Sequence, residues 1–230
     1  RSRFATTGNF IDFGDLTQGK RNMGGTTAGN KTRGLYGGGY IKVPGNAVTN
    51  VIEHITFAST GGGTDFGDLT DARRVVASAS SPTRTVFQGG VASTATSNVR
   101  DIIDYVTTAS TGNAQDFGDL VSAKRDHSGG SSAVRAMTAG NTGNSNAVDF
   151  ITIASTGNST DFGDLTVGRS STGAGSNSVI LAVYGGTSPG VDVTIDQLTI
   201  STTGNAVDFG DAARGGEKPG AASSGHGGLN

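Results

Sequence analysis

Short segments of this chain alternate apolar and polar residues with a period of two. Ile55 and Phe57 lie two positions apart, as do Ile151 and Ile153, and a threonine separates the members of each pair. Alternation of this kind is typical of a β-strand that buries one face. No segment shows the sustained 3.6-residue period of an amphipathic helix, so the pattern predicts strands throughout the chain.

A tetrapeptide, Asp-Phe-Gly-Asp, divides the chain into repeats. Its five occurrences begin at Asp12, Asp65, Asp116, Asp161 and Asp208. A loosely spaced period of about 50 residues is typical of one supersecondary unit copied around an axis, with insertions confined to loops. The sequence therefore predicts a repeat architecture.

Each repeat predicts four short antiparallel strands. The first follows the tetrapeptide and carries a basic residue and a polar stretch, as in residues 69–81. The second is a short apolar run that ends in small residues, as in residues 35–38, and the third is the alternating segment. A Thr-Gly-Asn turn, as at residues 156–158, leads into the tetrapeptide strand. Gly and Asn tolerate positive φ, which suits this turn to a tight hairpin.

One four-stranded sheet of this kind cannot bury both faces, whereas copies packed face to face around an axis can. That arrangement is a β-propeller, so the predicted fold is all-β, with four-stranded antiparallel blades. We expect the phenylalanine of each tetrapeptide to form the core between blades: Phe13, Phe66, Phe117, Phe162 and Phe209. We expect the glycine of the tetrapeptide to allow a β-bulge or a close backbone approach.

The two ends of the chain complete each other. Residues 4–9 repeat the pattern of residues 200–205, and Gly227-Gly228 stands at the position of the glycine pair. We expect a single domain, 1–230, in which a split blade closes a five-bladed ring and removes the free sheet edges. The predicted blades are copy 1 (16–68), copy 2 (69–119), copy 3 (120–164), copy 4 (165–211) and a closing copy (212–230 plus 1–15). The alternatives are a segment of a six- or seven-bladed ring, or a ring assembled from several chains.

Composition narrows the classes of function. The formal net charge is -2 and the pI about 5.9, so the chain lacks the basic net charge that is typical of nucleic-acid-binding proteins. The chain has no cysteine, which excludes disulfides and cysteine-ligated metals. No apolar run approaches the roughly 18 residues of a membrane span, so we expect no membrane insertion. Glycine supplies 39 of the 230 residues and hydrophobic residues only 33 %, which favours many thin sheets over helices.

The apolar run ending in Gly-Gly and the alternating strand after it resemble kelch-type propellers, although this chain lacks the kelch tryptophan. The fuller pattern at residues 149–166 resembles the kelch-like repeats found in virion proteins of tailed bacteriophages. This resemblance implies a virion location and a structural role in a tail fibre, a spike or a capsid decoration. It implies other virion proteins and a host-surface glycan as partners, and it is compatible with a homo-oligomer.

The paired carboxylates of each tetrapeptide, such as Asp161 and Asp164, suggest a calcium site or acid–base chemistry. Calcium loops need three or more carboxylates at alternating positions, and only two occur here. A catalytic pair would also not need five copies. We therefore expect these side chains to make turn hydrogen bonds and pairings between blades.

In four copies a basic residue stands five positions after the second Asp of the tetrapeptide: Lys20, Arg73, Lys124 and Arg169. One interpretation is a salt bridge to the neighbouring Asp. The other is a ring of cations at one mouth of the channel that binds anions, either sugar acids or lipopolysaccharide phosphate. A second basic residue follows directly in three copies, at Arg21, Arg74 and Arg125.

The sequence contains no constellation that points to catalysis. Its three histidines occupy different repeat positions, and no nucleophile elbow, phosphate loop or His-Glu-x-x-His motif occurs. We therefore expect no catalytic residues, no metal, no cofactor and no enzymatic activity.

The leading hypothesis is a structural or adhesive virion protein that presents variable loops on a rigid ring. These loops are residues 40–50, 91–98, 141–146 and 187–192. The second hypothesis is a secreted, lectin-like carbohydrate-binding propeller outside any virus.

Overall fold

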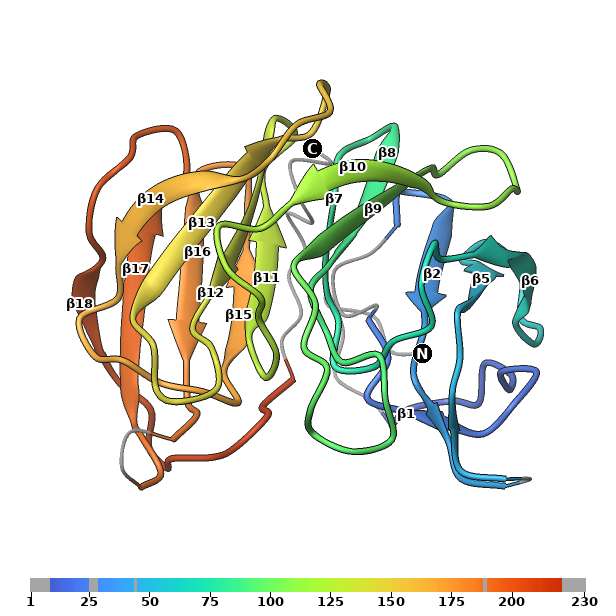
Figure 1. The fold of residues 1–230 in the computed structure, drawn as a ribbon, viewed down its shortest axis with the longest axis horizontal. Coiled ribbons are helices and arrows are strands. Elements are labelled where there is room, and N and C mark those ends of the chain that lie inside the picture. Colours follow the sequence, from blue (N-terminus) through green and yellow to red (C-terminus); the bar gives the residue numbers. More distant parts are fainter. Residues whose placement is uncertain (1–8, 25–28, 44, 188–189, 221–230) are drawn as a thin grey trace.

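The computed structural model describes residues 9–24, 29–43, 45–187 and 190–220 (Figure 1). Within these ranges the chain forms 18 β-strands and no helix. The strands make five antiparallel sheets of three or four strands. The predicted all-β class is confirmed.

Copies 2, 3 and 4 each form one four-stranded sheet whose strands follow sequence order. Copy 2 comprises β7 (Ala77–Ser80), β8 (Arg84–Gln88), β9 (Ile102–Thr107) and β10 (Gln115–Asp119). Copy 3 comprises β11 (Ser128–Ser131), β12 (Arg135–Ala139), β13 (Ala147–Thr152) and β14 (Thr160–Asp164). Copy 4 comprises β15 (Gly173–Ser176), β16 (Ile180–Tyr184), β17 (Thr194–Thr199) and β18 (Val207–Asp211). The polar stretch, the apolar run, the alternating segment and the tetrapeptide are thus the four strands of each copy, as predicted.

Copy 1 departs from this pattern. Its main sheet has three strands, β2 (Arg33–Gly37), β5 (Val51–Thr56) and β6 (Thr64–Asp68). Isolated bridges from Gly24 and Gly29 to β2 stand where the other copies have a first strand. The long connection between β2 and β5 forms a hairpin, β3 (Tyr40–Ile41) and β4 (Ala47–Val48), which pairs with β1 (Lys20–Arg21).

The predicted closing copy lies partly within the described ranges. Its described residues, 9–15 and 212–220, form no strand, and the predicted glycine pair Gly227-Gly228 lies outside the described residues. The N–H of Gly186 donates to the carbonyl oxygen of Gly216 at 2.8 Å. In copy 2 the N–H of the equivalent residue, Gly90, donates to the carbonyl oxygen of Lys124 in the next copy, also at 2.8 Å. Gly216 therefore stands where the other copies carry their basic residue.

Each tetrapeptide strand contains a β-bulge at its phenylalanine. In copy 2 the ladder between β9 and β10 passes directly from Asp116 to Gly118, which leaves Phe117 as the extra residue. The same irregularity occurs in copies 1, 3 and 4. Gly118 has a φ of 140°, and a Cβ there would lie 2.6 Å from the backbone of Gly157 in copy 3. The β-bulge and the close backbone approach that were expected at this glycine are both confirmed.

The tetrapeptide strand of one copy binds the turn that precedes the tetrapeptide of the next copy. Gly112 N–H donates to the carbonyl oxygen of Phe66, and Ala114 N–H donates to that of Asp68, both at 2.7 Å. Asp68 N–H in turn donates to Oδ1 of Asn113 at 3.1 Å. Equivalent bonds join copy 2 to copy 3 and copy 3 to copy 4, so neighbouring sheets are held together by one repeated junction.

The apolar core consists of three clusters that lie between neighbouring sheets. Phe66, Phe117 and Phe162 are buried in these clusters, with exposures of 2–3 %. Phe13 is half-buried, and Phe209 is 69 % exposed. Among the described residues no further sheet covers the outer face of copy 4, so Phe209 lacks the neighbours that bury the other three.

The first strands β7, β11 and β15 lie side by side near the middle of Figure 1. Each ends in a serine. Ser80 N–H donates to Oγ of Ser131 at 3.1 Å, and Ser131 N–H donates to Oγ of Ser176 at 3.0 Å. Gly29 N–H of copy 1 donates to Oγ of Ser80 at 2.7 Å. The first strands are therefore linked in series by bonds to a serine hydroxyl of the next copy, and Ser131 Oγ also donates to the carbonyl oxygen of Ser80 at 2.8 Å.

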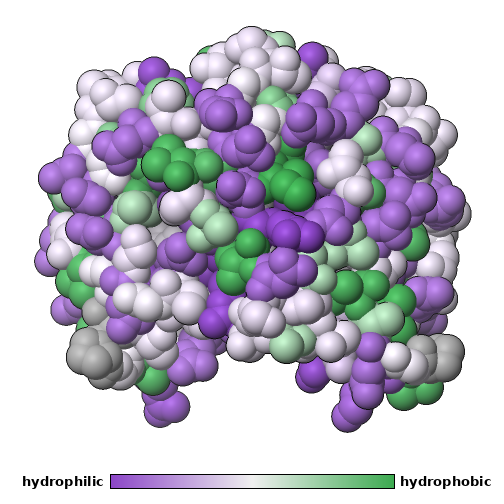
Figure 2. Space-filling view, in the orientation of Figure 1, coloured by the Kyte–Doolittle hydropathy of each residue, from purple (hydrophilic) through white to green (hydrophobic). Residues whose placement is uncertain are grey.

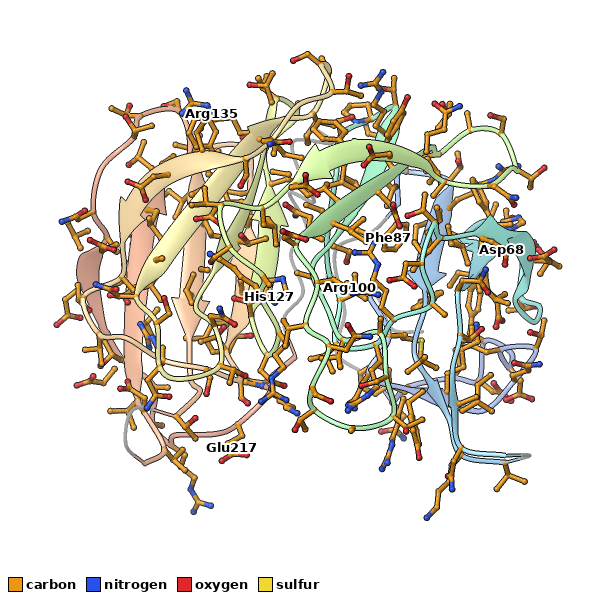
Figure 3. All side chains as sticks on the ribbon, in the orientation of Figure 1. Asp68, Phe87, Arg100, His127, Arg135 and Glu217 are labelled. Carbon is orange, nitrogen blue, oxygen red and sulfur yellow. The ribbon has the colours of Figure 1, made fainter. Side chains whose placement is uncertain are left out.

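The sheets have two different ends. Short turns connect the first strand to the second, and the third to the fourth, at the end where Arg135 lies in Figure 3. The loops between second and third strands, and the connections from one copy to the next, lie at the opposite end, which is lower in Figure 1. We call these the hairpin end and the loop end.

Candidate functional site

The four basic residues singled out by the repeat are buried in ion pairs. Their partners are carboxylates in the third strand of the same copy: Lys20 with Glu53, Arg73 with Asp104, Lys124 with Asp149 and Arg169 with Asp196. The Lys20–Glu53 pair measures 2.6 Å and the Lys124–Asp149 pair 3.0 Å. The side chains of the four cations are at most 1 % exposed. Each pair ties the start of a copy to its third strand.

Arg73 shows which groups bind such a buried pair. Besides Asp104, its guanidinium donates to the carbonyl oxygens of Gly89 at 2.9 Å and Ile102 at 2.7 Å. Asp104 also accepts the hydroxyl of Thr70 at 2.5 Å and the amide of Thr70 at 3.2 Å. A buried charge is tolerated when it is paired and hydrogen-bonded in this way.

Burial and pairing act against each other on the pKa values of these groups. Burial lowers the pKa of the Lys124 ammonium and raises the pKa of the Asp149 carboxyl, and the charge of each partner opposes the shift. Burial also raises the pKa of Glu53. Hydrogen bonds from Lys20 and the amide of Thr17, together with the charge of Lys20, outweigh burial and lower that pKa below its ordinary value.

The structure thus gives these four basic residues a partner other than the neighbouring Asp. The first Asp of the tetrapeptide instead accepts the amide of its own glycine. This bond measures 3.0 Å from Gly14 to Asp12 and 2.8 Å from Gly210 to Asp208. An anion could reach the four cations only if the ion pairs opened. Anion binding by Lys20, Arg73, Lys124 and Arg169 therefore stays a prediction.

The second basic residue behaves differently, because it lies at the loop end and is not buried. Arg21 is exposed, and its guanidinium carbon lies 4.7 Å from the centre of the Tyr40 ring. Arg74, from copy 2, lies 5.8 Å from the same ring centre. Copy 1 and copy 2 therefore bring two arginines to one aromatic side chain.

A cavity of about 200 Å³ lies where the first strands begin, and all five copies contribute to it. Each copy supplies the residue seven positions after its tetrapeptide: Asn22, Val75, Asp126, Ser171 and Lys218. The ammonium of Lys218 lies 3.2 Å from the carboxylate of Asp126 across this cavity. One repeat position thus lines a common space with five different side chains.

The same five residues share an unusual backbone conformation, with φ between 51° and 59°. This conformation lets the main chains of successive copies bond to each other. Val75 N–H donates to the carbonyl oxygen of Asn22, and Ser171 N–H to that of Asp126, both at 2.6 Å. Lys218 N–H donates to the carbonyl oxygen of Ser171 at 2.7 Å. The rim of the cavity is therefore built from main-chain bonds between copies.

His127 lies near the middle of the molecule and also lines the cavity (Figure 3). Its ring packs against Gly89, where a Cβ would lie 2.9 Å from its Cε1 atom. Burial and the charge of Lys124 lower the pKa of His127 from 6.5 to about 3. The imidazole is therefore neutral at pH 7.

The loops around the cavity differ from copy to copy. Copy 1 carries the β3–β4 hairpin between residues 38 and 50, whereas copy 3 has only residues 140–146 in the same place. Hydrophilic side chains project at this end in Figure 2, and Glu217 lies there in Figure 3. Within the described ranges no group of three or more His, Asp or Glu side chains could hold a metal ion. The described residues also include no helix long and apolar enough to cross a membrane.

Comparison with protein-family models gives no match for this chain, and comparison with curated proteins gives none either. The resemblance to kelch-like repeats of phage virion proteins therefore stays a prediction.

Sequence reasoning missed the carboxylate partners and the Tyr40 cluster. A signal for the partners was available, because every third strand carries an acidic residue at one repeat position: Glu53, Asp104, Asp149 and Asp196. No comparable signal existed for Tyr40. It lies in a loop of one copy only, and its contact with Arg74 depends on how two copies pack.

Proposed function

We propose that this chain is a non-catalytic binding protein built as a closed five-bladed β-propeller. The central cavity supports the ring, because the closing copy contributes to it at the same repeat position as the four complete copies. Pro219 of the closing copy and Met23 of copy 1 line this one cavity. That proximity favours a closing copy that lies between copy 4 and copy 1.

The exposed apolar groups at both ends of the described repeats support the same closure. On copy 4, Val207 is 59 % and Phe209 69 % exposed. On copy 1, Phe57 is 45 % exposed beside an apolar cavity of about 390 Å³. A complete blade between these two surfaces would cover both. Residues 4–9 repeat the sequence pattern of 200–205, which suits them to the junction with copy 4.

The observation that carries the binding function is the contrast between scaffold and loops. The junctions between neighbouring copies use the same bonds, whereas the loops around the cavity differ in length and side chains. A scaffold that repeats while its loops vary is the usual basis of recognition. The loop end is therefore the binding end in this proposal.

We place this function in a virion on the strength of the sequence pattern at residues 149–166, which resembles virion proteins of tailed bacteriophages. The chain would act in a tail fibre, spike or capsid decoration at the particle surface. Its partners would be other virion proteins and a host-surface glycan, and the blades of several copies could associate as a homo-oligomer.

Binding of the fluorescently labelled chain to a panel of bacterial cells and to a glycan array would test the adhesive function. A variant in which Gly-Gly replaces residues 40–47 shortens the loop end. Its control replaces residues 109–111, at the hairpin end, with Gly-Ser-Gly. We expect the first variant to lose binding and the second to retain it. If the unaltered chain binds no cell and no glycan, the adhesive function is wrong and an architectural role is left. Antibody labelling of particles in electron micrographs would test the virion location.

The alternative is a secreted, lectin-like carbohydrate-binding propeller. Tyr40 favours this candidate, because it is an aromatic side chain at the loop end and is only half-buried. The neighbouring genes would separate the two functions: portal and tail genes support the virion protein, and secretion genes support the lectin.

A further inference from the structure

The β3–β4 hairpin holds Tyr40 between arginines from two copies. Arg21 and Tyr40 are directly opposed in the ladder of β1 and β3, which keeps the guanidinium over the ring at 4.7 Å. Arg74 reaches the same ring from copy 2, at 5.8 Å. Two positive charges from different copies therefore lie against one ring.

The charge of these two arginines is not neutralised by a carboxylate of the described residues. Arg74 donates to the carbonyl oxygens of Ser93, Thr94 and Ala95 at 3.1, 3.3 and 2.9 Å. These bonds fix its position but supply no formal negative charge. The main chain of Arg21 pairs with Tyr40, but its side chain makes no hydrogen bond or ion pair within the described part of the chain. Asp71, an acidic residue of the same loop end, is already bound to Arg100 at 2.7 Å.

The cluster occurs in one place along the described repeats. The equivalent position is Arg125 in copy 3, Ser170 in copy 4 and Glu217 in the closing copy. Among the described residues only Tyr40 is an aromatic ring shared by two of these side chains. A feature confined to one pair of copies is not needed to build the repeat, so the scaffold does not account for it.

We propose that Arg21, Arg74 and Tyr40 form an oxyanion site that binds the carboxylate or phosphate group of an acidic surface polysaccharide. Guanidinium groups match these oxyanions because their planar N–H donors can bind two oxygens at once. Arg21 would supply such a pair of donors, and Arg74 would add Nη1, because its Nε and Nη2 already donate to carbonyl oxygens. The inference deepens the proposed function and rests on the loop end being the binding end. It names the ligand class as acidic rather than neutral sugars.

A single oxyanion at this half-exposed site binds weakly, with a Kd on the order of 1 mM. Copies of the chain displayed together on one particle would raise the effective affinity by avidity. The site therefore suits reversible contact with a repetitive polymer.

NMR titration of the ¹⁵N-labelled chain tests the site directly, with sodium D-glucuronate, glucose 6-phosphate and neutral glucose as probes. We expect an acidic probe to shift the Arg Nε signals of Arg21 and Arg74, and glucose to shift neither. The probe that binds more tightly identifies the source of the oxyanion as a sugar acid or a sugar phosphate. Absence of shifts with both acidic probes up to 50 mM would overturn the proposal.

Three variants separate binding from folding. Arg21→Gln alters an exposed side chain, so the variant is expected to fold with an unchanged melting temperature and to lose at least ten-fold in affinity. Arg21→Lys should retain part of the affinity, because the charge stays while the planar donors are lost. Arg125→Gln is the matched control in copy 3 and should bind as the unaltered chain does. If Arg21→Gln and Arg125→Gln lost affinity for the acidic probe equally, the binding would be nonspecific charge attraction and the proposed site would be overturned.

The outcome for this site is independent of the outcome for the proposed function. Cell binding that persists in Arg21→Gln, with no shift by either acidic probe, would overturn the oxyanion site and leave loop-end adhesion standing. Probe binding without any binding to cells would retain the oxyanion site and count against adhesion.

Discussion

Arg73 shows at the scale of one residue why a charged side chain can belong to a core. Its guanidinium is bound by Asp104 and by two carbonyl oxygens, and both ionic side chains are fully buried. The desolvation of each charge is offset only by its partner, so each depends on the other. The pair specifies how the start of copy 2 docks on its third strand.

We expect Arg73→Met to lower the free energy of unfolding by about 3–5 kcal/mol, because Asp104 would stay buried without a counter-charge. The double variant Arg73→Met/Asp104→Leu should recover much of that loss. Arg100→Ala is the control, because the Arg100–Asp71 pair is 34 % and 30 % exposed, and should cost about 0–1 kcal/mol. Urea denaturation measures all three, and equal losses in Arg73→Met and Arg100→Ala would contradict the role assigned to the buried pair.

His127 should make the stability of the protein depend on pH. Its pKa is about 3 in the folded chain, against an ordinary value of 6.5. Between pH 6.5 and pH 3 the unfolded chain binds more protons than the folded chain. The contribution of neutral His127 to the free energy of unfolding is therefore complete above pH 6.5 and is lost as the pH falls towards 3. We expect up to about 1.4 kcal/mol per pH unit from this group. Denaturation between pH 7 and pH 4 should show a shallower loss for His127→Gln than for the unaltered chain. A loss of the same slope in both would show that His127 is not the group responsible.

At the scale of elements, the copies are connected by the segment that runs from the tetrapeptide strand of one copy to the first strand of the next. In each of five copies its seventh residue has a positive φ, and main-chain bonds join several of these residues in succession. Copy 1 uses asparagine here, which tolerates that conformation, but copy 2 uses Val75. A β-branched residue is strained at positive φ, so the bond to Asn22 is made in spite of the side chain.

Exchanging these two residue types should therefore change stability in opposite directions. We expect Val75→Asn to raise the free energy of unfolding by about 1 kcal/mol and Asn22→Val to lower it by a similar amount. Thermal denaturation of the two variants provides the measurement, with the junction bond kept in both. A loss of stability in Val75→Asn would mean that the packing of the valine outweighs its strain.

At the scale of the whole molecule, the tetrapeptide strand of copy 4 is the feature that bears on ring closure, because none of the described residues forms a next copy against it. Gly163 meets the carbonyl oxygen of Gly204 in the next copy, where a Cβ would lie 2.5 Å away. Gly210 occupies the same repeat position, with a φ of 137°, but nothing among the described residues lies within 4 Å of such a Cβ. In the closed ring, residues 7–9 would provide the missing turn.

Alanine at these two glycines tests the closure. Gly163→Ala should cost about 2–4 kcal/mol, from the positive φ and the steric conflict together. If the ring is closed, we expect Gly210→Ala to lower the free energy of unfolding by as much as Gly163→Ala does. A cost of only about 1 kcal/mol, the conformational part alone, would indicate an open end. Urea denaturation gives the free energies, and analytical ultracentrifugation shows whether a second chain fills the junction instead.

The agreement between sequence and structure is closest where interactions are local. The tetrapeptide predicted a bulge and a close approach at its glycine, and Gly118 has both. The prediction of a tight hairpin turn at Thr-Gly-Asn was wrong in position, because the turn lies just before this segment, where Ser110 N–H donates to the carbonyl oxygen of Thr107 at 3.2 Å. Asn113 and its equivalents instead bind the preceding copy. The pairing of Arg73 with Asp104 was missed although every third strand carries an acidic residue at this repeat position, because the two residues are 31 apart in sequence and meet only when the sheet has formed.

By itself, the sequence determined the period of the repeat, the four strands of a copy and the all-β class. These follow from side-chain alternation and turn chemistry, which act within a few residues. Only the tertiary structure decided which charges are buried and which are open. The folding of copy 2 turns Arg73 inward to Asp104 of the same copy, and the packing of copy 1 on copy 2 leaves Arg21 and Arg74 outside at Tyr40. Adjacent basic residues therefore have opposite environments, because desolvation depends on the neighbours that folding supplies and not on the residue type.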